Sequence, residues 1–69
     1  MEMQPVTSSN IAAIGRDEAT GVMVVNFTNG GSYQYKGVPV SVFNEFLAAE
    51  SKGKFFAANI KGKYEGSRL

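Results

Sequence analysis

The sequence predicts an α+β fold: a three-stranded antiparallel β-meander covered by a C-terminal helix plus a second short helix, in the order β-β-β-α-α. Within residues 22–28, Met23, Val25 and Phe27 fall on one face of an extended segment and polar residues fall on the other, which is typical of a half-buried strand. A glycine-rich turn at residues 29–31 separates this segment from the next strand. After Pro39, apolar residues recur at three- and four-residue spacing, as they do on one face of a helix.

The first two strands differ in how clearly their faces can be assigned. Residues 11–14 are apolar throughout and are followed by a turn-rich segment, so they predict a strand whose buried face cannot be identified. In the second strand, Met23, Val25 and Phe27 share one face, whereas Asn26 falls on the other. We therefore expect the Met23 face to be buried.

The hairpin after the second strand allows two registers. A two-residue turn at residues 29–30 would place Tyr33 and Tyr35 on the same face as Asn26. A three-residue loop at residues 29–31, with Gly31 in the left-handed conformation, places both tyrosines on the apolar face. We expect the second register because it brings the large apolar groups together. Its pairs are Thr28 with Ser32, Phe27 with Tyr33, and Val25 with Tyr35.

Two helices follow the third strand. The first begins after Val38 and Pro39, because proline is tolerated in a first helical turn and the residue before it resists helical angles. Its apolar stripe should cover the sheet and consists of Val42, Phe43, Phe46 and Leu47. The second helix is expected over residues 52–61, with Ser51 as its N-cap and Gly62 as its stop.

The remaining segments carry weaker signals. The tail after the second helix is expected to be extended or frayed, with Tyr64 as its anchor. We expect a single domain over residues 1–69, in which residues 1–6 and 65–69 are poorly ordered.

The composition removes most enzyme mechanisms. The chain has 69 residues and contains no cysteine and no histidine, so thiolates, imidazole bases and the usual zinc ligands are absent. Asp17 and Glu18 are neighbours in a loop, which is poor geometry for a catalytic carboxylate pair. We expect no catalysis, no cofactor and no metal. A chain this short often completes its core by self-association, so a homo-oligomer is expected. It shows no signal peptide or membrane span, and the expected location is cytoplasmic.

The formal net charge of +1 is distributed unevenly along the chain. Six of the 7 lysine and arginine residues follow Tyr35, whereas the acidic residues divide equally between the two parts. An anionic partner would therefore dock most naturally on the C-terminal half. The alternative is that these lysines form a solvated face that keeps the protein soluble.

Three segments together resemble the KTSC domain, a short bacterial and phage module named for its occurrence at the C-terminus of some lysyl-tRNA synthetases. They are "SSNIAAIG", "VMVVNFTNGGSYQYKGVP" and "SKGKFFAANIKGKY", and the similarity runs from about Pro5 to the end. The Tyr33-Gln34-Tyr35 motif is central to the family pattern. Arg16 departs from the family pattern, because many members have an aromatic residue at this position. The link to a tRNA enzyme implies RNA binding for this chain.

Each candidate binding residue can be explained by a structural role as well as by ligand binding. Tyr33 and Tyr35 can pack as core, or stack on bases beside Lys36, and each ring can be buried while its hydroxyl reaches a ligand. Lys54 and Lys61 lie two helical turns apart, so both can point the same way toward phosphate. The candidate ligand-binding residues are Tyr33, Tyr35, Lys36, Lys54, Lys61, Tyr64, Ser9 and Asn10.

We expect a non-catalytic binding module whose ligand is RNA or another phosphate-bearing nucleotide. Two alternatives remain open. One is a phage-borne homo-oligomer that sequesters a small nucleotide signal in a pocket between subunits. The other is a protein–protein interaction module without a nucleotide ligand.

Overall fold

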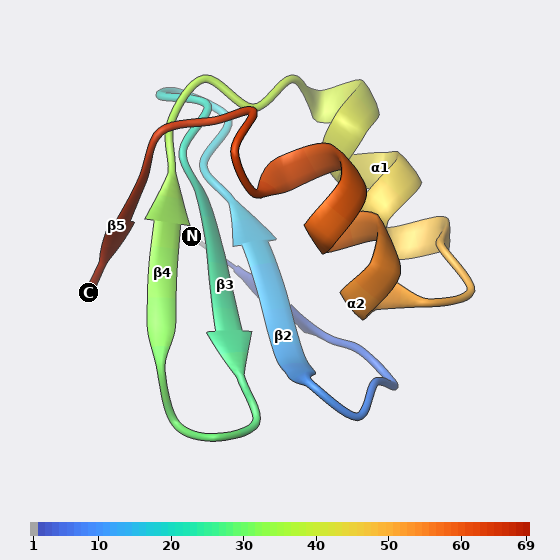
Figure 1. Ribbon diagram of the computed structural model, residues 1–69. Helices are drawn as coiled ribbons and strands as arrows, with labels where there is room; N and C mark the ends of the chain where they lie inside the picture. Colours follow the sequence, from blue (N-terminus) through green and yellow to red (C-terminus); the bar gives the residue numbers. More distant parts are fainter. Residues whose placement is uncertain (1) are drawn as a thin grey trace.

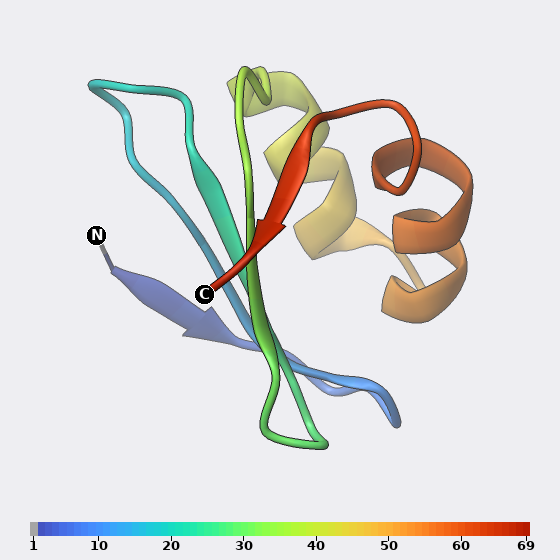
Figure 2. The ribbon, with the colours of Figure 1, turned by 60° about the vertical axis from the view of Figure 1, so that its left-hand side comes forward.

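The chain folds into a five-stranded antiparallel sheet with helices on one face (Figures 1 and 2). The structure is a computed structural model, and it describes residues 2–69. The strands are β1 (Met3–Pro5), β2 (Ile11–Arg16), β3 (Met23–Phe27), β4 (Ser32–Tyr35) and β5 (Gly66–Arg68). They lie side by side in chain order. The helices are α1 (Val40–Ala48) and α2 (Lys52–Phe55), and α2 continues into a π-helical turn, η1 (Phe56–Ile60).

The core lies between the sheet and these helices. Its fully buried side chains come from β2, β3, the loop before α1, α1 and η1, and the largest are Phe46, Ile11, Ile14, Met23, Ile60, Val25 and Val38. The face predicted for the second strand is confirmed, since Met23 and Val25 are buried and Phe27 packs against the core. In β2 a register shift between Ile11 and Ala13 turns both isoleucines inward. The two isoleucines are three residues apart, so simple alternation would have placed them on opposite faces.

Both helices begin where the sequence predicts. Pro39 is the N-cap of α1, with φ −64° and ψ 150°, and the predicted stripe packs on the core through buried Phe46. The Ser51 hydroxyl accepts a hydrogen bond from the Lys54 amide at 3.3 Å, which caps α2. Gly62 has a φ of 83° just after η1, which only glycine adopts easily.

The predicted number of strands is wrong: the sheet has five strands and not three. The two additional strands, β1 and β5, lie inside the terminal segments 1–6 and 65–69, for which we expected poor order. Each has three residues and no alternating apolar pattern, so strand propensity alone does not identify it. They form because β2 and β4 offer unpaired edges to the two ends of the chain.

Gly66 shows how closely β5 approaches its neighbour. It pairs with Tyr35, and a Cβ at position 66 would clash with Cε1 of the Tyr35 ring. Any larger side chain would therefore displace either the ring or the strand. This contact fixes the position of β5 against the tyrosine motif.

The hairpin register differs from the predicted one by two residues, because Val25 lies opposite Tyr33 and Met23 lies opposite Tyr35. The loop has the predicted three residues but occupies positions 28–30. The Gly30 amide bonds to the Phe27 carbonyl at 3.0 Å, and Gly30, not Gly31, has the left-handed φ of 96°. A shift of two residues preserves the faces of a strand, so both tyrosines remain on the helix-covered side.

Candidate functional site

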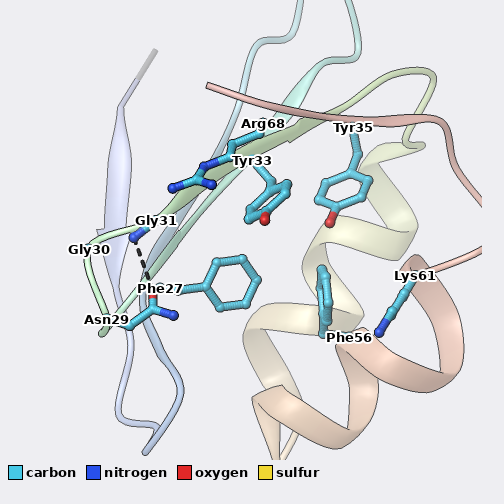
Figure 3. Close-up of a pocket in the computed structure, with 9 residues that line it drawn as sticks. All are labelled: Phe27, Asn29, Gly30, Gly31, Tyr33, Tyr35, Phe56, Lys61 and Arg68. Atoms are coloured by element: carbon cyan, nitrogen blue, oxygen red, sulfur yellow. Dashed lines mark hydrogen bonds between the residues drawn. The ribbon is translucent and has the colours of Figure 1, made fainter.

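An open hollow of about 570 Å³ lies on the helix-covered side of the sheet, beside the β3–β4 loop (Figure 3). Its lining comes from β3, the loop, β4, η1, the turn after η1, and β5. The lining residues are Phe27, Asn29, Gly30, Gly31, Tyr33, Tyr35, Phe56, Lys61 and Arg68. Segments from both ends of the fold therefore meet at one place on the surface.

Four aromatic rings form the apolar part of this hollow, which we call the aromatic hollow. Phe27 packs edge to face against Tyr33, with ring centroids 5.7 Å apart, and against Phe56 at 5.3 Å. Phe56 in turn packs edge to face against Tyr35 at 5.6 Å. Such contacts hold each ring in a defined orientation, so the wall of the hollow is pre-formed.

The two tyrosines contribute differently. Tyr35 is buried, with 7% of its surface exposed, whereas Tyr33 is half-buried and offers ring surface as well as its hydroxyl. Both hydroxyls point into the hollow (Figure 3), and no hydrogen bond joins either of them to another group within residues 2–69. The predicted combination of a buried ring with an accessible hydroxyl is thus met in the geometry of Tyr35.

Burial raises the pKa of the Tyr35 hydroxyl above its usual value of 10.0, and the neighbouring Tyr33 adds to the shift. The phenol is therefore neutral near pH 7 and can donate a hydrogen bond. A neutral donor beside ring edges favours a ligand that carries acceptor oxygens or nitrogens.

Two cations, Lys61 and Arg68, complete the lining, and both are exposed. Lys61 follows η1, and Arg68 lies on β5 directly opposite Tyr33. The lining contains no aspartate or glutamate. An aromatic wall can also hold a quaternary ammonium group, but two cations disfavour a positive ligand and favour an anionic one.

The β3–β4 loop supplies a rigid rim. The Asn29 side-chain oxygen Oδ1 accepts a hydrogen bond from the Gly31 amide at 3.0 Å, drawn as a dashed line in Figure 3. Together with the left-handed Gly30, this bond sets the direction in which the loop leaves β3. The sequence predicted this loop only as the turn of a hairpin, and its place on the rim of the hollow follows from the tertiary fold.

Three of the predicted site residues lie elsewhere, around a second hollow of about 510 Å³. Ser9 and Asn10 line it from the loop before β2, and Lys54 lines it from α2. The Ser8 hydroxyl accepts bonds from the Asn10 and Ile11 amides, each at 3.3 Å, which makes this loop a turn in its own right.

The expectation that Lys54 and Lys61 point the same way is wrong, since they line different hollows. Two features break the seven-residue spacing: the helix widens into a π-helical turn at η1, and Lys61 is already outside it, with ψ 123°. Their neighbour Lys52 instead donates a bond from Nζ to the Ala49 carbonyl at 2.5 Å and closes the end of α1.

Lys36 and Tyr64 line neither hollow. Lys36 is exposed at the end of β4, and its backbone amide bonds to the Glu65 carbonyl at 3.2 Å. Tyr64 is half-buried and packs against the core, which agrees with its predicted role as an anchor.

Sequence reasoning missed three contributors to the aromatic hollow. Phe27 was expected only in the core, and Phe56 was not among the candidate site residues; both are half-buried and line the hollow. Arg68 was placed in a frayed tail. The available signal for Arg68 was its place two residues after Gly66, in a segment that can pair with the open edge of the third predicted strand, which is β4 in the structure.

Within residues 2–69, no cluster of carboxylates is placed to hold a metal ion. No helix in that part of the chain combines the length and the apolar character needed to cross a membrane.

Comparison with known proteins gives consistent results. The family model of the KTSC domain matches residues 7–64. A protein of Tsukamurella paurometabola is 43% identical over 67 residues, which cover 97% of this chain and 100% of that protein. A lysine–tRNA ligase of Trichormus variabilis is 36% identical over 53 residues, which cover 77% of this chain and only 9% of the ligase.

The fold agrees as well. The crystal structure of a KTSC domain protein from Yersinia pestis superposes with a TM-score of 0.95 at 41% identity, and the match covers 99% of this chain and 96% of that one. The resemblance predicted from the three sequence segments is confirmed, and the chain belongs to the KTSC domain family.

Proposed function

We propose that this domain binds, without catalysis, a phosphate-bearing nucleotide in the aromatic hollow, either as a free nucleotide or as one unit of an RNA strand. The observation that carries the proposal is the convergence of partnerless tyrosine hydroxyls, half-buried rings and two cations on one hollow. These three kinds of group suit the base, the sugar and the phosphate of a nucleotide.

Each part of a nucleotide matches a part of the lining. The half-buried rings of Tyr33 and Phe27 offer aromatic surface to a base, a contact worth about 1–3 kcal/mol in single-stranded complexes. The Tyr35 hydroxyl can bond to a base edge or to the sugar. Lys61 and Arg68 supply charge-assisted bonds to phosphate oxygens. The volume of about 570 Å³ lies in the usual range for a small-molecule site.

The proposal that the nucleotide belongs to an RNA strand is supported by one of the proteins to which this chain is similar. Part of a lysine–tRNA ligase is similar to this chain, and that enzyme acts on an RNA substrate. The transfer of RNA binding from the ligase to this chain is an analogy, because the similar region makes up 9% of the ligase. The lining of the hollow is complete within one chain, so this proposal does not require a pocket between subunits.

Titration calorimetry tests the proposal. The parent should bind a ribonucleoside monophosphate with one site per chain, and Lys61→Gln should weaken binding by about tenfold, on the order of one lost charged contact. Lys36→Gln is the matched control, because Lys36 is an exposed lysine outside the hollow, and its binding should equal that of the parent. Equal weakening by both substitutions would mean that general positive charge, and not the hollow, attracts the ligand.

A further inference from the structure

The two cations of the aromatic hollow lie on opposite sides of its aromatic wall. Figure 3 shows the Arg68 guanidinium beside Tyr33 and Gly31, while the Lys61 side chain ends beside Phe56. The rings of Phe27 and the two tyrosines are drawn in the space between them. Groups that are apart in one view are at least that far apart in space, so the two cations do not converge on a single point.

This separation has a backbone origin. Arg68 is held by the pairing of β5 with β4, opposite Tyr33, whereas Lys61 leaves the turn after η1, where its amide bonds to the Phe56 carbonyl at 2.9 Å. The two side chains are therefore anchored to different layers of the fold. Cations anchored to different layers in this way can each meet a phosphate of their own.

We propose, as a refinement that rests on the proposed function, that the hollow binds a nucleoside with a phosphate on each side, that is, a 3′,5′-bisphosphate unit. The base lies against the rings, and Lys61 and Arg68 each contact one of the two phosphates. This chemistry occurs in every internal nucleotide of an RNA strand and also in free nucleoside 3′,5′-bisphosphates. A nucleoside 5′-diphosphate carries the same number of phosphates but places both on one side.

The comparison of these two ligands is the test, because they differ in where the phosphates are attached and not in how many they have. The four common ribonucleosides, each as the 3′,5′-bisphosphate and as the 5′-diphosphate, are titrated into the parent by calorimetry at fixed salt. We expect the bisphosphate of the preferred base to bind at least about tenfold more tightly, the effect of one well-placed charged contact.

Variants assign the phosphates to the cations. Lys61→Gln and Arg68→Gln should each reduce the bisphosphate preference to near one, and Arg68→Lys should retain part of it because it keeps the charge. Lys54→Gln, which changes a lysine of the second hollow, should keep the full preference. Thermal melts establish that every variant is folded.

The outcomes separate this refinement from the proposed function. If both ligands bind equally well to the parent, the two-sided site is wrong while nucleotide binding in the hollow stands. If neither binds, both are wrong. A three-nucleotide RNA that binds more tightly than the free bisphosphate identifies a strand as the source, and equal affinity identifies the free compound.

Discussion

The substitution Tyr35→Phe separates the two roles assigned to this tyrosine. It removes the hydroxyl that points into the aromatic hollow and leaves the buried ring in place. The hydroxyl has no hydrogen-bond partner within residues 2–69, so its loss should change the free energy of unfolding by less than about 1 kcal/mol. Nucleotide binding should weaken about two- to tenfold, since one hydrogen bond contributes about 0.5–1.5 kcal/mol.

Truncation of the same residue gives the opposite pattern. Tyr35→Ala removes the ring of a residue with only 7% of its surface exposed, a ring whose centroid lies 5.6 Å from that of Phe56. Removal of such a ring costs about 3–5 kcal/mol. For a domain of this size, that loss lowers the melting temperature by about 12 °C or more.

Thermal melts and one calorimetric titration on each variant are sufficient to check both expectations. Tyr64→Phe is the matched control, because it removes a hydroxyl from a half-buried tyrosine outside both hollows. Its affinity should equal that of the parent. A Tyr35→Phe variant that binds as tightly as the parent would refute the role given to the hydroxyl, and a stably folded Tyr35→Ala variant would refute the role given to the ring.

Four other substitutions and one change of pH test the fold. Phe46→Ala empties a fully buried site and should cost about 3–5 kcal/mol in chemical denaturation, whereas half-buried Phe27→Ala should cost less. Gly66→Ala places a methyl group against the Tyr35 ring and should destabilise by about 1–3 kcal/mol, with β5 amides losing protection from hydrogen exchange. Gly30→Ala meets no atom within 4 Å, so its cost of about 1–2 kcal/mol should come from the left-handed backbone alone. Because the fold raises the pKa of Tyr35 above 10.0, it favours the neutral phenol; that stabilisation is complete below pH 10 and is lost as the pH rises further, so parent stability should fall relative to Tyr35→Phe only in alkaline melts.

The faces of the strands could be predicted from the sequence, but the exact pairing could not. Met23 and Val25 share the face of Phe27, opposite Asn26, whatever the loop does, because side chains repeat every two residues, and both are buried. The pairing depends on which glycine takes the left-handed conformation. Gly30 and Gly31 are equally capable of it, so the sequence leaves a choice that the loop hydrogen bonds decide.

The candidate site was predicted in part. Tyr33, Tyr35 and Lys61 do line one hollow. The strand pattern places the two tyrosines, whereas Lys61 lies just outside η1 and reaches the hollow from the turn after it. Arg68 could not be placed, because β5 has only three residues and exists through its pairing with β4. Lys54 was grouped with Lys61 on the assumption of a regular helix, and the π-helical turn at residues 56–60 has no signal in the spacing of apolar residues.

The most direct test of nucleotide binding in the aromatic hollow is a titration followed by amide chemical shifts in an ¹⁵N-labelled sample. With a ribonucleoside 3′,5′-bisphosphate, saturable shifts are expected for the amides of Gly30, Gly31, Tyr33 and Arg68, which surround the hollow. Shifts confined to the second hollow, around Asn10 and Gly53, or the absence of any saturable shift, would contradict the proposed site.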